Sequence, residues 1–362
     1  MEKLKKYIES AVTGLDAVQR APIVCYETDL RCLRIGDISQ LKSFDEWGFT
    51  NATMEDISQF FIKKDDNFIA RTGSTIGCSY FAKASLKSVF NNGIIRLRTT
   101  KEMLPQYLSF LMQTNDFRKY VNNVGMASAT QPNIKINDML DYELEVPSLQ
   151  TQQHIVNTIG SVDDLIENLL KQNENLYKLG QTIINCLNDE QELLPLSQIV
   201  TFVKGTEVGS QNYIERNGEG LIRYLRVGDL SQLGNTFVED VNEYAHAEPE
   251  DILIAFDGAP GRNSYGLEGI YSSGIYKVNC VSEYKGFVYF ELNSELNIKI
   301  INDYSQGTTI LHASKAIPHL KYSCVLKQDI DKLNVIFNQM LINKKKISEL
   351  QNVKSNLLYK YF

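Results

Sequence analysis

The most constraining feature of this chain is an eight-residue segment that occurs twice. Residues 33–40 read LRIGDISQ, and residues 225–232, offset by 192 positions, read LRVGDLSQ. Every aligned pair is identical or exchanges one aliphatic residue for another. Similarity at such a spacing indicates one structural unit written twice.

Further similarities follow in the same order. Residues 68–74 match 253–259 and residues 92–97 match 273–278, while the offset falls to about 180 through insertions and deletions. We therefore expect two mixed α/β bodies, each followed by a long helix. A helix is expected at residues 105–120, with a weaker counterpart at 286–301. Strands are expected at residues 69–70, 93–97, 142–146, 222–227, 252–256 and 274–278.

Two segments carry a heptad pattern, which is typical of a coiled coil. Each would be roughly 50 Å long for about 33 residues, and each carries an asparagine on its seam, Asn173 or Asn343. One such helix alone would suit an amphipathic surface helix, but two favour an intramolecular, antiparallel pair. The seam residues are Ile155, Ile159, Val162, Ile166, Leu169, Asn173 and Leu176 in the first helix, and Leu333, Ile336, Met340, Asn343, Ile347, Leu350 and Leu357 in the second.

Composition narrows the function classes. The 362 residues are 43% hydrophobic and 22% charged, with a net charge of −7. This excludes a uniformly basic nucleic-acid coat and a polybasic membrane anchor. No apolar run approaches the ~18 residues of a membrane span, and the charged start predicts no secretory signal. Six scattered cysteines predict reduced thiols in a cytoplasmic protein.

Catalytic motifs are missing. The chain has no Pro-Pro pair of the kind found in adenine methyltransferases and no phosphate-binding Gly-x-x-x-x-Gly-Lys-Ser/Thr loop. Asp251 with Glu283 and Lys285 resembles a nuclease fragment, but such tripeptides are common. The four histidines have no catalytic partners at a recognisable spacing. We expect no catalytic residue, no metal and no cofactor in this chain.

The first copy carries a family resemblance. Residues 69–77 (IARTGSTIG), 125–134 (GMASATQPNI) and 144–155 (LEVPSLQTQQHI) resemble the recognition domain and central helix of type I restriction–modification specificity subunits. Two departures are residues 324–327 (CVLK), where a Pro-x-Leu turn is expected, and an amphipathic segment at 4–12 before the first body. The specificity subunit of a type IIB system therefore stays open as an alternative.

The resemblance implies a mixed α+β fold in which a long antiparallel two-helix coiled coil joins two target-recognition domains with pseudo-twofold symmetry. The domains would be residues 1–147 and 191–325, and the spacer helices residues 148–190 and 326–362. Such a chain is a non-catalytic reader of a bipartite, asymmetric target in double-stranded DNA. Its partners would be two methyltransferase subunits and a restriction endonuclease–translocase subunit, which use S-adenosylmethionine, ATP and Mg²⁺.

Ordinary side chains must then contact DNA, because Arg and Lys suit guanine and Asn and Gln suit adenine. Arg34 and Arg226 recur in both copies, so ion pairs with Asp37 and Asp229 are an equal alternative for them. Base readers should lie where the copies differ, which favours Arg71, Lys83, Arg262, Asn263 and Lys315. The full candidate set is Arg34, Arg71, Ser74, Thr75, Lys83, Gln131 and Asn133, then Arg226, Arg262, Asn263, Ser264 and Lys315.

The charge is uneven along the chain. Residues 1–145 are neutral, 146–190 carry −4, 191–325 carry −7 and 326–362 carry +4. Opposite charges on the two long helices suit their pairing. The acidic second body predicts weak binding of DNA by the isolated chain. An enzyme with an atypical site and a coiled-coil scaffold remain as competing functions, although a scaffold leaves the duplicated bodies unexplained.

Overall fold

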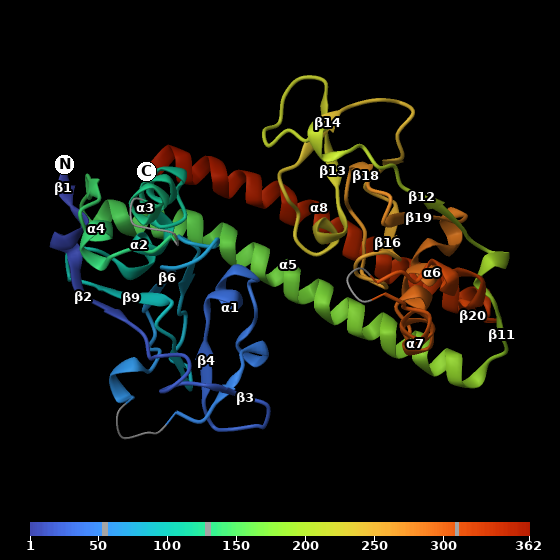
Figure 1. Ribbon diagram of the computed structural model, residues 1–362, viewed down its shortest axis with the longest axis horizontal. Coiled ribbons are helices and arrows are strands. Elements are labelled where there is room, and N and C mark those ends of the chain that lie inside the picture. Colours follow the sequence, from blue (N-terminus) through green and yellow to red (C-terminus); the bar gives the residue numbers. More distant parts are fainter. Residues whose placement is uncertain (53–56, 127–131, 308–310) are drawn as a thin grey trace. The chain divides into compact units, whose positions relative to one another are not determined.

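The computed structural model describes residues 1–52, 57–126, 132–307 and 311–362, without the side chains of residues 189 and 190. The chain forms two compact units (Figure 1). Unit 1 comprises Met1–Asp164 and Asn352–Phe362, and unit 2 comprises Leu165–Gln351. Two long helices, α5 (Leu149–Glu190) and α8 (Lys327–Tyr361), contribute residues to both units.

Unit 1 contains two four-stranded sheets and a two-stranded one. The first has the order β2-β9-β6-β7 and is antiparallel throughout; the second has the order β3-β5-β4-β8, with β4 and β8 parallel. The strands are β1 (Glu2–Lys3), β2 (Ile8–Thr13), β3 (Ile23–Val24), β4 (Arg31–Leu33), β5 (Phe49–Thr50), β6 (Asn67–Ala70), β7 (Ser79–Phe81), β8 (Ser88–Phe90), β9 (Ile94–Thr99) and β10 (Glu143–Leu144). The helices are α1 (Ile35–Ser39), α2 (Pro105–Leu111), α3 (Asn115–Met126) and α4 (Ile136–Leu140).

Unit 2 repeats this arrangement. Its four-stranded sheets have the orders β12-β19-β16-β17 and β14-β13-β18-β15, with β13 and β18 parallel, and β11 pairs with β20. The strands are β11 (Leu193–Pro195), β12 (Thr201–Lys204), β13 (Leu221–Leu225), β14 (Phe237–Glu239), β15 (His246–Ala247), β16 (Ile252–Ala255), β17 (Asn263–Ser264), β18 (Gly269–Tyr271), β19 (Ile275–Asn279) and β20 (Lys321–Ser323). The helices are α6 (Lys285–Leu292) and α7 (Glu295–Asp303), with short 3-10 helices η7 (Val227–Leu230) and η9 (Ser314–His319).

The predicted fold class and internal repeat are confirmed, and each of the six predicted β-rich runs contains a strand. The segment at residues 4–12 was expected to precede the first body, and this is wrong. It forms a 3-10 helix, Leu4–Tyr7, and the edge strand β2, which pairs with β9 as β12 pairs with β19 in unit 2. Strand β2 is therefore part of the repeat.

The single helix predicted at residues 105–120 is also wrong, because it is broken into α2 and α3. The Thr114 hydroxyl donates to Leu111 O at 2.8 Å and accepts from Phe117 N at 3.2 Å, so it ends one helix and caps the next. In unit 2, Ser294 Oγ accepts from Asn297 N at the start of α7. A hydroxyl therefore divides the helix in both copies.

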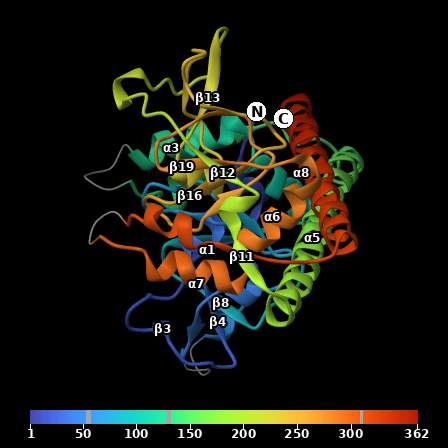
Figure 2. The same cartoon turned by 90° about the vertical axis from the view of Figure 1, so that its right-hand side faces the viewer.

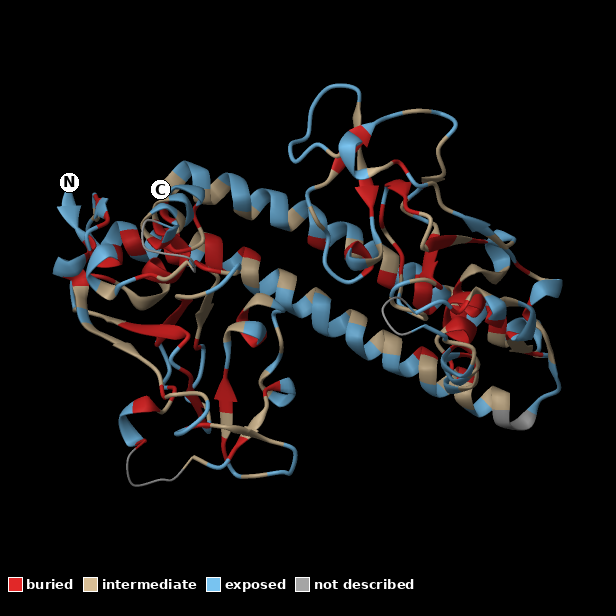
Figure 3. Cartoon of the chain, viewed as in Figure 1, coloured by how far each residue is buried: buried red, intermediate tan, exposed pale blue. Residues whose placement is uncertain are grey.

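The seams of α5 and α8 pair in opposite directions within each unit. In unit 1, His154 contacts Tyr361, and Asp163 Oδ1 lies 2.6 Å from Lys354 Nζ. The residue numbers along α5 therefore rise while those of their partners along α8 fall, so the helices are antiparallel. Every predicted seam residue is buried or half-buried. In Figure 3, less exposed residues alternate with exposed ones along both long helices.

In unit 2, α5 and α8 lie side by side in both views (Figures 1 and 2). The two seam asparagines meet there. Asn343 Nδ2 donates to Asn173 Oδ1 at 2.9 Å, and Asn173 Nδ2 donates to Met340 O at 3.1 Å. Asn343 is 1% exposed, so this amide pair sets the register of an otherwise apolar seam.

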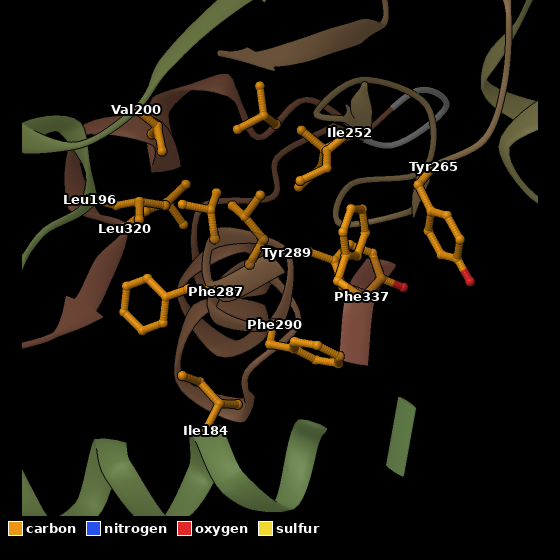
Figure 4. Close-up of a cluster of buried hydrophobic side chains, with 14 of the residues drawn as sticks. Ile184, Leu196, Val200, Ile252, Tyr265, Phe287, Tyr289, Phe290, Leu320 and Phe337 are labelled. Atoms are coloured by element: carbon orange, nitrogen blue, oxygen red, sulfur yellow. The ribbon is translucent and has the colours of Figure 1, made fainter. Parts of the chain in front are cut away.

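The core of unit 2 lies between α6, the first sheet and both long helices (Figure 4). Phe287, Phe290 and Ile184 pack in it. The Phe290 ring lies so close to Gly180 of α5 that a Cβ at position 180 would overlap it. Glycine inside a helix is costly, and here it allows the aromatic ring to pack against the helix backbone.

In each unit, a side-chain amide of a long helix holds the body to that helix. In unit 1, Gln152 of α5 is 0% exposed. Its Oε1 accepts from Leu104 N at the start of α2, and its Nε2 donates to Glu102 O and Pro147 O. In unit 2, Asn334 Oδ1 of α8 accepts from Gly286 N at 2.7 Å at the start of α6. Both amides satisfy unpaired N–H groups of a helix N-terminus.

The seam amides should be strongly coupled. We expect Asn343→Leu to lower the free energy of unfolding by roughly 1–3 kcal/mol, because Oδ1 of the half-buried Asn173 loses its hydrogen-bond donor. Asn173→Leu should cost a similar amount. The double variant should be as stable as wild type or more so, since the seam is then apolar throughout. Urea unfolding of all four proteins measures the coupling, and additive losses would contradict it.

A buried carboxyl predicts pH-dependent stability in unit 2. Burial raises the pKa of Glu291 on α6 to about 7, although Ser323 N donates to its Oε1 at 2.6 Å. The folded state therefore keeps a proton that the unfolded state releases above pH 4.5. The associated stability is complete below that pH and is lost as the pH rises through 7, a change of roughly 3 kcal/mol. Glu291→Gln should remove this dependence in urea unfolding between pH 5 and 8, whereas the exposed Glu295→Gln should retain it.

Candidate DNA interface

The recurring LRIGDISQ segment forms the same turn in both units. Asp37 Oδ2 accepts from Arg34 N at 2.9 Å, and Asp229 Oδ2 accepts from Arg226 N at 2.7 Å. Both carboxylates are buried and both arginine side chains are exposed. The aspartates therefore build the turn through the arginine backbone, although Arg226 Nε also lies 3.7 Å from Asp229.

A second shared feature is the loop that follows the central strand of each first sheet. After β6 the chain turns through Gly73 and Gly77, and after β16 it turns through Gly258 and Gly261. All four glycines have φ between 80° and 85°, a conformation that other residues avoid. The two loops thus share their backbone turns and differ in their other residues.

A returning segment crosses each loop. In unit 1, Ile134 N donates to Arg71 O at 2.8 Å and Gly73 N donates to Pro132 O at 3.3 Å. In unit 2, Ala313 N donates to Phe256 O at 2.7 Å and Gly258 N donates to Leu311 O at 2.8 Å. We call this feature the crossing; it comprises residues 71–73 with 132–134 in unit 1 and 256–258 with 311–313 in unit 2.

The side chains at the crossing differ between the units. In unit 1, Arg71 Nε donates to Asn133 Oδ1 at 3.1 Å, so two predicted residues lie together. In unit 2, His312 Nδ1 lies 2.8 Å from Asp257 Oδ1. The two crossings therefore carry an Arg–Asn pair in one unit and an Asp–His pair in the other; Asn133 and His312 hold equivalent positions, whereas Asp257 corresponds to Thr72, the residue after Arg71.

Asp257 and His312 were missed by reasoning from the sequence. The alignment of residues 68–74 with 253–259 already placed Asp257 opposite Thr72. The second partner comes from a segment 55 residues further along, where the copies cannot be aligned by eye, so no local pattern joined the two.

The remaining predicted residues fall into distinct settings. Ser74, Arg262 and Lys315 are exposed and Thr75 is half-buried. Lys83 is exposed, and its Nζ lies 3.3 Å from Asp164 Oδ1. Asn263 is half-buried and its Nδ2 donates to Asn293 Oδ1 at 2.8 Å. Gln131 lies outside the described residues.

Ser264 lies inside unit 2 and not on its surface. It is 7% exposed, and Lys344 Nζ of α8 donates to its Oγ at 3.0 Å and also to Tyr265 O. Burial lowers the pKa of Lys344 to about 8. This lysine therefore joins strand β17, which follows the loop through Gly258 and Gly261, to the long helix α8.

The described residues contain neither a cluster of metal-binding side chains nor a membrane-spanning helix. No group of three or more His, Cys, Asp or Glu side chains in this part of the chain could hold a metal ion. Among the described helices, none is long and apolar enough to cross a membrane.

Part of the chain is similar in sequence to known proteins. Residues 34–177 match the type I restriction modification DNA specificity domain. The type I restriction enzyme MjaIX specificity subunit of Methanocaldococcus jannaschii is 32% identical over 101 residues, which cover 28% of this chain and 23% of that protein. The MjaVIII specificity subunit of the same organism is 25% identical over 171 residues, covering 44% and 39%. The matches thus span less than half of either relative.

The fold extends the similarity to the whole chain. The S subunit of a type I restriction–modification system from M. genitalium superposes with a TM-score of 0.57 at 17% identity, covering 100% of this chain and 95% of that one. The chain thus has the fold of a type I specificity subunit. The domain match is limited to residues 34–177, whereas the similarity of fold covers the whole chain.

Measurements of unfolding can distinguish the structural role of Asp229 in the recurring turn from the role of the exposed Arg226 side chain. Asp229→Ala removes acceptors for Arg226 N and for Gly234 N at 2.7 Å, so we expect a loss of about 2–3 kcal/mol. Arg226→Gln, at an exposed side chain, should change stability by less than about 0.5 kcal/mol. Thermal or urea unfolding compares them, and equal losses would show that the arginine also builds the fold.

Proposed function

We propose that this chain is the DNA specificity subunit of a type I restriction–modification complex. Each unit reads one half of a bipartite, asymmetric target in double-stranded DNA. The paired helices α5 and α8 set the gap between the half-sites. The chain itself supplies recognition and no catalytic group.

The observation that carries this proposal is the crossing. The same backbone is built twice, yet its side chains are Arg71 and Asn133 in one unit and Asp257 and His312 in the other. A purely structural role does not explain why the side chains differ while the backbone is retained. Recognition of two different half-sites does explain this difference.

The proposed partners are two methyltransferase subunits and a restriction endonuclease–translocase subunit. The charge distribution supports a dependence on them, because residues 191–325 carry a net charge of −7. Phosphate contacts supply most of the affinity of DNA-binding proteins, so the isolated chain should bind weakly. The type IIB alternative is not favoured, since the matched domain and both curated relatives are of type I.

The proposal is tested by sequencing methylated adenines in DNA exposed to the chain together with a type I methyltransferase subunit from the same genome. A bipartite motif should emerge. Replacing residues 191–325 with the equivalent segment of a relative should change one half of that motif and leave the other intact. A continuous motif, or changes in both halves, would count against two independent readers.

The spacer role predicts the effect of added helix length. The antiparallel pairing requires a matched change, so seven residues are inserted between Asp164 and Leu165 and seven more between Gln351 and Asn352, at the unit boundaries. Each insertion adds about 10.5 Å of helix, which should widen the gap in the methylated motif by about three base pairs. The half-site sequences should stay the same. Inserting in α5 alone is the control, and it should break the Asn173–Asn343 register and abolish methylation.

A further inference from the structure

The crossing also indicates which base chemistry each unit selects. We propose that the crossing is the principal base-reading position of each unit, with unit 1 selecting guanine and unit 2 selecting a base that donates an amino group, cytosine above all. This inference rests on the proposed function and deepens it.

In unit 1 the crossing presents donors. Arg71 Nε is engaged by Asn133 Oδ1 at 3.1 Å. Among the described residues, the Nη groups of Arg71 and Nδ2 of Asn133 have no protein acceptor. These groups can only donate. Guanine offers the matching edge in the major groove, with acceptors at N7 and O6.

In unit 2 the crossing presents acceptors. A carboxylate only accepts, so the proton between Asp257 Oδ1 and His312 Nδ1 lies on the histidine. Asp257 Oδ2 then remains an acceptor. His312 has a side-chain exposure of 61%. Cytosine offers the matching N4 amino donor, which aspartate accepts in known complexes.

The two pairs are not needed to hold the backbone together. Main-chain hydrogen bonds already join the crossing strands in both units, at 2.7–2.8 Å in unit 2 and 2.8–3.3 Å in unit 1. The side chains are therefore free to differ without loss of the turn. Their chemistry is opposite, donor against acceptor, which is the difference that two unlike half-sites require.

The test is a selection from random-sequence duplex DNA with the full chain and its co-expressed methyltransferase subunit. Asp257→Asn should change the favoured base from cytosine to adenine at one position of one half-site, by about tenfold or more. Arg71→Gln should change guanine to adenine in the other half-site by a similar factor. Thermal melting checks that each variant is folded. If Asp257→Asn does not fold, His312→Gln takes its place, because that side chain is largely exposed.

Unit 2 offers a matched control. His246 Nε2 lies 2.8 Å from Asp240 Oδ1, the same pair of residue types away from the crossing, so Asp240→Asn should leave the motif unchanged. If the wild-type complex enriches a bipartite motif that Asp257→Asn and Arg71→Gln do not alter, or that Asp240→Asn alters equally, the inference is overturned and the proposed function stands. If the wild-type complex enriches no sequence, both are overturned.

Discussion

Each long helix is held to its body by an amide side chain, which is buried at Gln152 and half-buried at Asn334. Gln152 holds the start of α2 and Asn334 holds the start of α6. A helix N-terminus has N–H groups that must find acceptors, so the amide and the helix end constrain one another. In unit 2 the approach is close enough that a Cβ at Gly286 would lie 2.6 Å from Asn334 Cα. Within each unit, this contact joins the long helix to the start of the neighbouring helix, α2 or α6.

The duplication conserves backbone geometry more than side-chain chemistry. The sheet orders, the turn built by Asp37 or Asp229 and the glycine turns all recur. Even the amide that fastens the helix comes from different residue types, Gln152 and Asn334. What diverges most is the pair at each crossing, together with the charge of the bodies. A protein that must read two unlike sequences needs this division between a shared frame and variable readers.

Much of the architecture could be predicted from the sequence. The repeat and the heptads can be read directly from the sequence. They were therefore sufficient to predict the two bodies, the six strand regions and the seam residues. The break between α2 and α3 at Thr114 could not be predicted. It depends on local hydrogen bonds of one hydroxyl group, which do not interrupt the helical spacing of the apolar residues. Strand β2 was read as amphipathic because it is an edge strand. The partnership of Asp257 with His312 required the tertiary fold, and so did the burial of Ser264 under Lys344.

The division into units has a consequence for biosynthesis. Unit 2 is a continuous stretch of chain, whereas unit 1 includes residues 352–362 as well as the first 164. The Phe362 ring packs against Tyr107 at a centroid distance of 4.9 Å, and Lys354 pairs with Asp163. During translation, residues 1–164 therefore cannot complete unit 1 until residues 352–362 have been synthesised. The emerging first body carries an unpaired helix seam for the whole translation of the second, which makes this interval the natural time for a chaperone to act.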